Sequence, residues 1–364
     1  MLNYFISPFN FNFDKPVCEV IDYFQKNIVQ IYVKGAIFLK LRKVLRMKSA
    51  FVFPGQGSQY VGMGSTLANN FPKARLVFEE VDEALGESLS KLIWEGDISN
   101  LTLTRNAQPA LMATSIAALK ALESEGFSVS DLSYMAGHSL GEYSALCAAG
   151  ALTLYDCSKL LRSRGDAMQS AVQVGEGAMV AIIGLSSDQV NELIKEVNPA
   201  GICEVANDNE PSQVVISGNK KTVNQISEAA KERGARRALQ LPVSAPFHCS
   251  LMSPAREKMS EALENVIIKV PVVPIVSNVL ALPITDPISI RLRLLDQVVG
   301  MVRWRESVCF MKNNGVMRFV ELGAGKVLSG LIRRITLKNE QEKIETLNVG
   351  DVTEVRKIRE VFGV

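Results

Sequence analysis

The pattern of hydrophobic and polar positions predicts strands and helices that alternate along the chain. Short apolar runs at 50–53 and 132–136 lead into proline or glycine and are typical of buried strands. A longer, helical spacing of apolar positions occurs at 71–85, 107–125 and 140–149. Strand, turn and helix in this order predict an α/β domain with a mainly parallel sheet.

Residues 177–244 follow a different order and are expected to form a unit of their own. The order of elements predicted there, β-α-β-β-α-β, is the ferredoxin-like arrangement. We therefore expect a small α+β subdomain inserted into a larger α/β domain. The pattern places its strands at 178–185, 203–206, 213–217 and 237–243, its helices at 187–197 and 220–233, and a polar Asn-Asp-Asn-Glu-Pro turn at 207–211.

The larger domain is then built from two segments of the chain, 47–176 and 245–345. In the second segment, strands are expected around Ile275 and Phe319, and a helix is expected to begin near Lys326. Residues 346–364 are expected to form a C-terminal tail.

The first 46 residues differ from the rest and are treated as a leader. They carry seven Lys/Arg and three Asp/Glu, and their apolar stretch at 28–41 is interrupted by three polar residues. That stretch is too short and too broken to span a bilayer, and a signal peptide would need an uncharged apolar region and a small-residue cleavage site. We expect a disordered extension, or residues outside the native protein, before a start at Met47. The alternative is an amphipathic helix on a membrane surface, and no stable insertion is expected.

Composition excludes several classes of function. The formal net charge is +2, and without the leader it is −2, so the body has no nucleic-acid signature. Six scattered cysteines form no C-x-x-C pair, and the chain has only two histidines, which argues against a metal site. Unpatterned cysteines suggest a reducing compartment, so we expect a cytoplasmic protein.

Ser139 is the candidate nucleophile of an acyl-transfer enzyme. It lies in Gly137-His138-Ser139-Leu140-Gly141, between a predicted strand and a predicted helix, which is the context of a nucleophile elbow. The glycines permit a strained turn, and the N-terminal N–H groups of the helix favour negative charge beside the hydroxyl. The alternative is a purely structural glycine-rich turn.

His248 is the candidate base, since a serine nucleophile needs one. The other histidine, His138, adjoins Ser139, and at an elbow its side chain should diverge from the hydroxyl. His248 lies where the small subdomain ends and the chain returns to the larger one, so a position in a cleft is expected. The alternative is a buried histidine with a purely structural role.

The body of the chain resembles malonyl-CoA:acyl carrier protein transacylases, the loading enzymes of fatty-acid synthesis, over about residues 47–340. The resemblance implies a hydrolase-like α/β domain with a ferredoxin-like insertion, in agreement with the pattern above. Its motifs are together highly specific. They begin with Phe51-Val52-Phe53-Pro54-Gly55-Gln56-Gly57-Ser58-Gln59, Asn106-Ala107-Gln108-Pro109-Ala110, Gly137 to Tyr143 and Arg162-Ser163-Arg164-Gly165. They continue with Val205-Ala206-Asn207, Val214 to Gly218, Pro246-Phe247-His248, Ser277-Asn278-Val279 and Glu321 to Leu328.

The resemblance also implies roles and partners. Ser139 would be acylated by malonyl-CoA with His248 as its base, and the product would be malonyl-acyl carrier protein. No cofactor and no metal are implied, and a monomer is expected. Arg164 would hold the free carboxylate of the malonyl group, for which a planar guanidinium is suited and lysine is not. The remaining roles fall to Gln56 and Leu140 as backbone donors to the oxyanion, to Gln108, His138 and Asn207 as pocket-lining residues, and to the main-chain carbonyl of Gln297 as the group that orients His248.

The Gln297 assignment rests on position alone, seven residues before Trp304. The family usually has Pro-Val-Arg-Trp here, whereas this chain has Met301-Val302-Arg303-Trp304. The preceding stretch at 288–295 is also unusually apolar and rich in arginine.

Three other functions stay open at this point. A serine esterase or thioesterase shares the elbow but normally recruits an Asp or Glu to the histidine, and several acids lie between Ser139 and His248. Arg164 argues against this alternative, because a hydrolase of uncharged esters has no need of it. The second alternative is a non-catalytic carrier- or lipid-binding protein, which would not need Ser139, His248 and Arg164 to be intact. An acyltransferase for another dicarboxylic acyl group is the third, and Phe247 before His248 favours the malonyl type.

Other motif-like runs carry less weight. Gly55-x-Gly57 lacks the third glycine of a dinucleotide fingerprint, because position 60 is tyrosine. A phosphate loop ending at Gly325-Lys326 would need glycine at 320 and Ser/Thr at 327, and both are valine. Cys249 beside His248 is expected to be an inert thiol. On charge alone, Lys326, Arg333 and Arg334 are candidates for docking an acidic carrier protein, or else are solvated helix charges.

Overall fold

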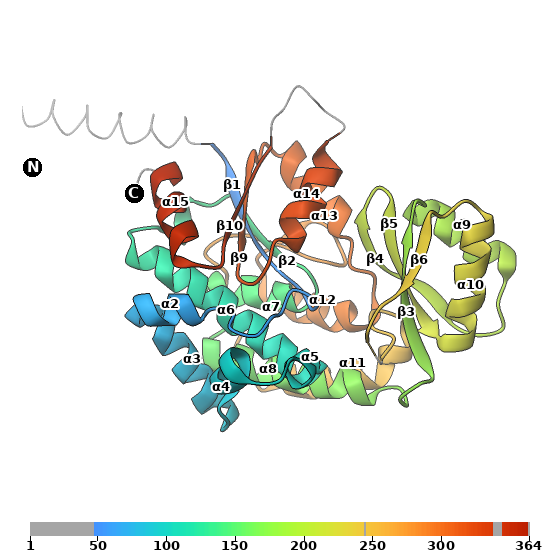
Figure 1. Cartoon of the computed structure of the whole chain (residues 1–364), viewed down its shortest axis with the longest axis horizontal. Coiled ribbons are helices and arrows are strands. Elements are labelled where there is room, and N and C mark those ends of the chain that lie inside the picture. The colour runs from blue at the N-terminus through green and yellow to red at the C-terminus, as the bar shows by residue number, and fades with distance from the viewer. Residues whose placement is uncertain (1–46, 244, 338–343, 363–364) are drawn as a thin grey trace, which may run out of the picture. The chain divides into compact units, whose positions relative to one another are not determined.

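The larger subdomain is built around a six-stranded sheet, in which five neighbouring strands run parallel (Figure 1). The structure is a computed structural model that describes residues 47–243, 245–337 and 344–362. The strand order is β10-β9-β1-β2-β7-β8, and only β8 is antiparallel to its neighbour. The strands are β1 (Ser49–Phe53), β2 (Tyr134–Gly137), β7 (Ile275–Val276), β8 (Pro283–Ile284), β9 (Arg318–Leu322) and β10 (Glu345–Val349).

Alternation along β1 explains why both faces of this sheet are covered. Successive side chains of a strand point to opposite faces. Phe51 and Phe53 pack into a core shared with helices α3, α6, α7 and α8, whereas Ala50 and Val52 pack into a second core with α13 and α14. All of these positions are fully buried, as expected for a parallel sheet between two helical layers.

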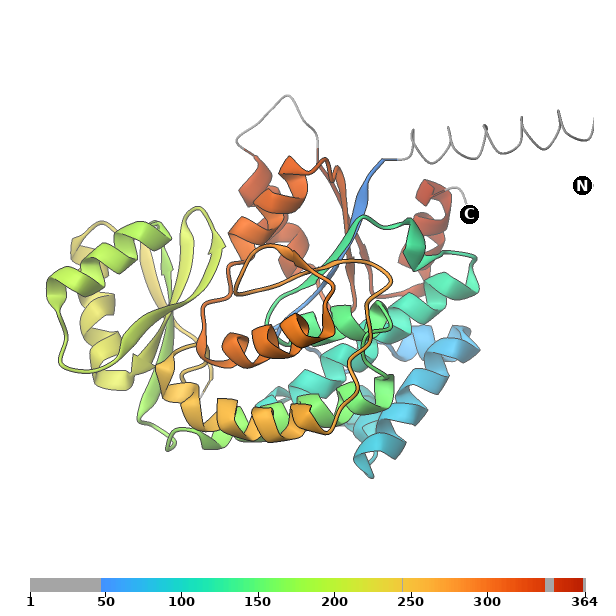
Figure 2. The ribbon, with the colours of Figure 1, turned by 180° about the vertical axis from the view of Figure 1, so that it is seen from behind.

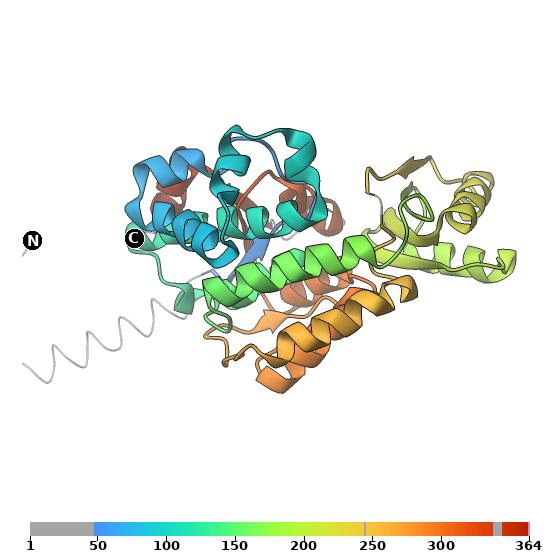
Figure 3. The same ribbon diagram turned by 90° about the horizontal axis from the view of Figure 1, so that it is seen from below.

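The helices surround the large sheet and form the two layers (Figure 2). Figure 3, which views the molecule from below, shows α8 and α11 side by side on the near face of the larger subdomain. The helices of the larger subdomain are α2 (Ser65–Asn70), α3 (Pro72–Leu85), α4 (Leu89–Glu95), α5 (Ile98–Thr102), α6 (Thr104–Ser124), α7 (Leu140–Ala148), α8 (Leu154–Ser170), α11 (Ser253–Glu264), α12 (Pro287–Val299), α13 (Trp304–Asn313), α14 (Val327–Thr336) and α15 (Val352–Phe362), with 3₁₀ turns at Val129–Asp131 and Ser250–Met252.

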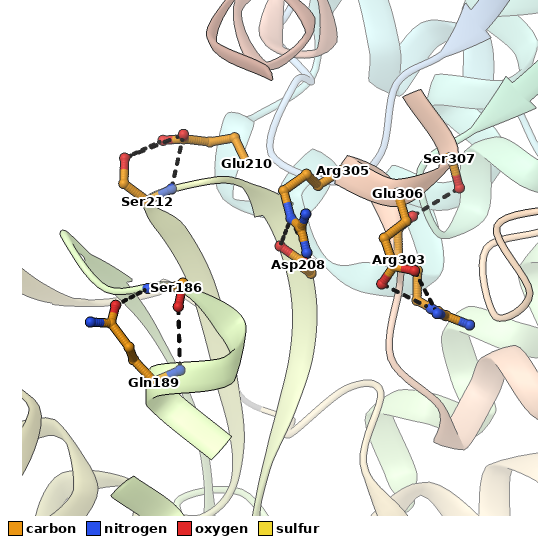
Figure 4. A network of polar contacts seen from close by, with 9 residues as sticks. All are labelled: Ser186, Gln189, Asp208, Glu210, Ser212, Arg303, Arg305, Glu306 and Ser307. Atoms are coloured by element: carbon orange, nitrogen blue, oxygen red, sulfur yellow. Dashed lines mark hydrogen bonds and ion pairs between the residues drawn. The ribbon is translucent and has the colours of Figure 1, made fainter. Parts of the chain in front are cut away.

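The small subdomain is the predicted ferredoxin-like unit. Its antiparallel sheet has the order β4-β5-β3-β6, and both helices pack on one hydrophobic core with it. Ser186 caps the first helix of this unit and forms a capping box with Gln189 (Figure 4). The elements are β3 (Gly177–Ile183), α9 (Ser187–Val197), β4 (Cys203–Glu210), β5 (Gln213–Asn219), α10 (Lys220–Glu232) and β6 (Arg237–Gln240).

Two details of the sequence-based prediction are wrong. The polar run at 207–211 is not a turn through its length, because β4 continues to Glu210 with two bulges and its last four residues are buried. Residues 346–364 are not a tail, because β10 pairs in parallel with β9 and α15 follows it. Leu347 and Val349 are buried at alternate positions of β10, and this period-two pattern of apolar residues was the signal for a strand in the sequence. The predictions for residues 1–46 lie outside the described residues.

The polar end of β4 joins the small subdomain to the larger one. Main-chain hydrogen bonds link Asp208 N to Val302 O at 3.0 Å and Val302 N to Ala206 O at 2.8 Å. The Asp208 carboxylate, 1% exposed, accepts hydrogen bonds from Nε and Nη2 of Arg305 at 2.9 and 2.7 Å (Figure 4). This tertiary ion pair explains how a charged residue is accommodated in a strand that the local pattern assigned to a turn.

We expect Arg305→Ala to destabilise the protein by about 2 kcal/mol or more, approaching the roughly 3–5 kcal/mol seen when one partner of a fully buried pair is removed. The Asp208 carboxylate would stay buried without its cation, and burial already raises its pKa. Arg303→Ala is the matched control. Arg303 pairs with Glu306 in a partly exposed position at the start of α13 (Figure 4), and its removal should cost less than about 1 kcal/mol. Denaturant unfolding checks both values, and equal losses would contradict this view of the junction.

None of the helices in the described part of the chain is long and apolar enough to cross a membrane.

Candidate active site

Ser139 occupies a strained elbow between β2 and α7. Its backbone has φ 53° and ψ −111°, a conformation that costs non-glycine residues of the order of 1–3 kcal/mol. The turn is too tight for side chains on either flank. A Cβ on Gly137 would lie 1.9 Å from the carbonyl of Gly141, and a Cβ on Gly141 would lie 2.2 Å from Phe53 O. The two glycines therefore permit the close backbone approach of this turn, which exposes the Ser139 hydroxyl at the end of β2.

His248 faces the Ser139 hydroxyl. Its Nε2 lies 2.8 Å from Ser139 Oγ, and its Nδ1 lies 2.8 Å from the main-chain oxygen of Gln297. A carbonyl oxygen only accepts, so Nδ1 carries the proton and donates it. In the neutral ring Nε2 is then the free acceptor, and the Ser139 hydroxyl donates to it. The tautomer is the one that a general base needs.

The charge state of His248 also suits a base. The side chain is 4% exposed, and burial, with a smaller contribution from the nearby Arg164 cation, lowers its pKa to about 3. At neutral pH the ring is therefore uncharged. Cys249 beside it is fully buried, its thiol donates to Pro246 O at 3.1 Å, and burial raises its pKa to about 11, as an inert thiol requires.

A buried arginine reaches the same hydroxyl. Arg164 of α8 is 1% exposed, and its Nη2 donates to Ser139 Oγ at 3.1 Å and to the side-chain oxygen of Gln297 at 2.8 Å. Its Nη1 donates to Gln108 Oε1 at 2.9 Å, and its buried Nε has no partner among the described residues. The guanidinium is thus held by neutral amide oxygens, an arrangement that leaves its charge available to an anionic ligand.

Two backbone N–H groups can serve an oxyanion. Gln56 follows the carboxyl end of β1, and Leu140 begins α7, so both lie at the same edge of the sheet because β1 and β2 are adjacent and parallel. Neither amide donates to another protein group within the described residues. The Leu140 amide also belongs to the helix N-terminus, where the dipole favours negative charge.

These groups share one cavity of about 170 Å³ between the two subdomains. The candidate residues on its wall are Gln56, Gln108, His138, Ser139, Leu140, Arg164, Asn207 and His248. Gln297 is fully buried behind the wall. His138 diverges from Ser139 as expected, since its Nε2 lies 2.8 Å from Asn209 Oδ1 in the small subdomain.

Sequence reasoning missed two residues that support the elbow. Asn278 accepts from Ser139 N at 2.8 Å with Oδ1 and donates to Gly137 O at 2.6 Å with Nδ2. Glu142, 1% exposed, accepts from Gln297 Nε2 at 2.6 Å and from Asn278 N at 3.3 Å. Both residues occur in the motifs of the family resemblance, but neither was assigned a role from the sequence. The available signal for Glu142 was an acidic residue in the first turn of a predicted helix of small residues.

The basic candidates for carrier docking lie apart from this cavity. Lys326 precedes α14 and forms an ion pair with Glu354 at 3.1 Å, and Arg334 pairs with Glu210 at 3.5 Å. Arg333 donates to Thr346 Oγ1 at 2.7 Å. Their role in docking stays a prediction.

Comparison with known proteins agrees with the site. Residues 50–350 match the family model of the acyl transferase domain. The chain is 47% identical over 305 residues to a malonyl CoA-acyl carrier protein transacylase of Bacillus subtilis, covering 84% of this chain and 94% of that protein. A crystal structure of an acyl-carrier-protein S-malonyltransferase from Bartonella henselae is 51% identical, with a TM-score of 0.84 over 87% of this chain and all of that one. A holo complex of a type II PKS acyl-carrier protein with its malonyl-transacylase is 40% identical, with a TM-score of 0.82 over 86% of this chain and 99% of that one.

Proposed function

Because the chain belongs to the acyl transferase domain family, and within it to the malonyl CoA-acyl carrier protein transacylases, we propose that it transfers malonyl from malonyl-CoA to the phosphopantetheine thiol of an acyl carrier protein. The observation that carries the proposal is the meeting of nucleophile, base and guanidinium at one hydroxyl. Ser139 Oγ lies 2.8 Å from His248 Nε2 and 3.1 Å from Arg164 Nη2.

The first half-reaction loads the enzyme. Ser139 Oγ attacks the thioester carbon while its proton passes to His248 Nε2, and the carbonyl oxygen becomes an oxyanion at the N–H groups of Gln56 and Leu140. Collapse of this intermediate breaks the carbon–sulfur bond. The His248 imidazolium then returns the proton to the departing CoA thiolate, which leaves malonyl-Ser139 and a neutral histidine.

The second half-reaction reverses the roles with a different thiol. His248 takes the proton of the carrier's phosphopantetheine thiol, and the sulfur attacks the malonyl-serine ester. A second oxyanion forms and collapses, and the proton on His248 goes to Ser139 Oγ as the ester breaks. The complex of a related malonyl-transacylase with a holo acyl-carrier protein supports a carrier as the acceptor.

The neutral groups that accept hydrogen bonds from Arg164 support a substrate with a free carboxylate. Its contacts to Gln108 and Gln297 are to amide oxygens, so an incoming carboxylate would be its direct counter-ion. A planar carboxylate can bind a guanidinium through two charge-assisted hydrogen bonds, which an acetyl group cannot do. A thioesterase for uncharged acyl groups is less well supported, because His248 Nδ1 is engaged by a main-chain carbonyl rather than by an Asp or Glu.

We further propose that the protein is a cytoplasmic monomer and uses no cofactor. The enzyme groups in the proposed steps are side chains and main-chain amides of this chain, and the steps exchange only an acyl group and protons. The cysteines of the described residues are unpaired, in keeping with a reducing compartment.

A transfer assay tests the proposal. The protein is mixed with malonyl-CoA, methylmalonyl-CoA or acetyl-CoA and with holo carrier protein, and the carrier is analysed by intact mass. We expect malonyl-carrier to accumulate fastest, with no transfer to the apo carrier that lacks the thiol. Release of free malonate without carrier product would indicate a thioesterase instead, and a preference for methylmalonyl-CoA would change the substrate.

A further inference from the structure

Glu142 is a buried carboxylate close to the reacting groups, yet it does not line the cavity. It lies in the first turn of α7, three residues after Ser139, and is 1% exposed. Its hydrogen-bond donors are Gln297 Nε2 at 2.6 Å and Asn278 N at 3.3 Å. A buried charge is costly unless it is paired or hydrogen-bonded, so the buried Glu142 carboxylate needs an explanation in terms of its contacts.

Glu142 makes the shortest of the contacts that determine which way the Gln297 amide points. Gln297 Nε2 faces three acceptors, namely the Glu142 carboxylate, Ser139 O at 3.0 Å and Asn278 Oδ1 at 3.4 Å. Its Oε1 accepts from Arg164 Nη2 at 2.8 Å. A flipped amide would set an oxygen against three acceptors and an NH₂ group against the guanidinium. An ionised carboxylate only accepts, so it enforces the observed orientation.

The amide of Gln297 thereby separates two opposite charges. Arg164 and Glu142 attract each other, but the amide stands between them, and no ion pair within 4.0 Å joins these two described residues. A direct Arg–Glu pair would compete with the carboxylate of a substrate for the guanidinium. This Arg164–Gln297–Glu142 relay offsets the buried cation from a distance and leaves the guanidinium without a direct carboxylate partner.

We propose that Glu142 is a positioning residue, which acts through the Gln297 side chain to hold the Arg164 guanidinium where the carboxylate of a malonyl group must bind. The inference rests on the proposed function and adds a determinant of its selectivity for acyl groups with a free carboxylate. Burial raises the pKa of Glu142 to about 7, so assays at pH 8 keep it mostly ionised.

The test is the ratio of malonyl loading to acetyl loading, measured by intact mass at pH 8. In Glu142→Gln the strongest of the three acceptors of Gln297 Nε2 is lost, and the new amide presents donors as well as an acceptor. The Gln297 amide is then held less firmly, and with it the acceptor of Arg164 Nη2. We expect malonyl loading to fall about tenfold or more and acetyl loading to fall much less, in line with the coupling between groups of one network. Equal losses for both acyl groups would overturn the proposal, since they would indicate a general effect on the elbow.

Glu321→Gln is the matched control for removing a buried carboxylate. Glu321 is fully buried and accepts from Leu328 N at 3.0 Å and Ser329 N at 2.7 Å at the start of α14. We expect this variant to lower the melting temperature while leaving the malonyl-to-acetyl ratio unchanged. A similar fall in the ratio would show that any buried carboxylate has this effect and would overturn the role assigned to Glu142.

A double-mutant cycle shows whether Glu142 acts through Arg164. In an Arg164→Ala background, Glu142→Gln should change the ratio no further, whereas the same fold-change in both backgrounds would overturn the relay. Should Glu142→Gln fail to fold, Gln297→Met carries the test, since it removes the amide but keeps the main-chain carbonyl for His248. An unchanged ratio in Gln297→Met would then refute the proposal. Failure of the wild type to load malonyl would instead refute the proposed function.

Discussion

Replacement of His248 by alanine is expected to slow the acylation of Ser139 by about a thousandfold, within the range of about 10²–10⁴ that a positioned general base contributes. The hydroxyl would lose the Nε2 acceptor that lies 2.8 Å away, and no Asp or Glu of the described residues is hydrogen-bonded to Ser139 Oγ to replace it. Rapid-quench intact-mass measurement of the acyl-enzyme checks the rate. Arg164 and the two backbone donors stay in place, so slow residual loading should persist.

His138→Ala is the matched control, because His138 is the other of the two histidines of the chain and adjoins Ser139. Its Nε2 contacts Asn209 rather than the hydroxyl, so we expect a loss of no more than about tenfold, as for the removal of a neutral hydrogen bond in the cavity wall. A larger loss in His138→Ala than in His248→Ala would reverse the assignment of the base.

Replacement of Arg164 by alanine is expected to reduce malonyl loading by about thirtyfold or more, because truncating one partner of a buried charge pair costs roughly 2–5 kcal/mol. Acetyl loading should be much less affected, since acetyl has no carboxylate. Arg164→Lys keeps the charge but loses the planar fork, and should recover only part of the malonyl rate. Loading rates for both acyl-CoAs, measured side by side, give the selectivity.

Arg162→Ala provides the control on the same helix. Arg162 donates to Asn106 Oδ1 at 2.7 Å and pairs with Glu87, away from the cavity. It should leave the ratio of malonyl to acetyl loading as in the wild type. Equal losses of malonyl and acetyl loading in Arg164→Ala would exclude Arg164 as the carboxylate-binding group.

The sequence could predict the parts of the site that depend on local pattern. Ser139 follows from a strand–turn–helix context with glycines where a Cβ would clash, and these are properties of a few neighbouring residues. His248 follows from the scarcity of histidines in the chain. The inserted subdomain follows from the order of its elements, which local periodicity shows well.

Other parts depend on contacts between distant residues and were not visible in the pattern. Gln297 lies 49 positions from the histidine that its carbonyl contacts, and only the family resemblance pointed to it. Glu142 and Gln297 are 155 positions apart, so nothing local marks their hydrogen bond. The polar end of β4 misled the prediction for the same reason, because Asp208 has its partner at Arg305, 97 positions away.

The most direct test of the account is brief incubation of the wild-type protein with malonyl-CoA, followed by peptide mapping and then by addition of holo carrier protein. We expect one malonyl mass per chain, located on the peptide that bears Ser139 and absent from Ser139→Ala. This label should disappear as malonyl-carrier forms. A protein that stays unmodified, or a label that persists in Ser139→Ala, would contradict it.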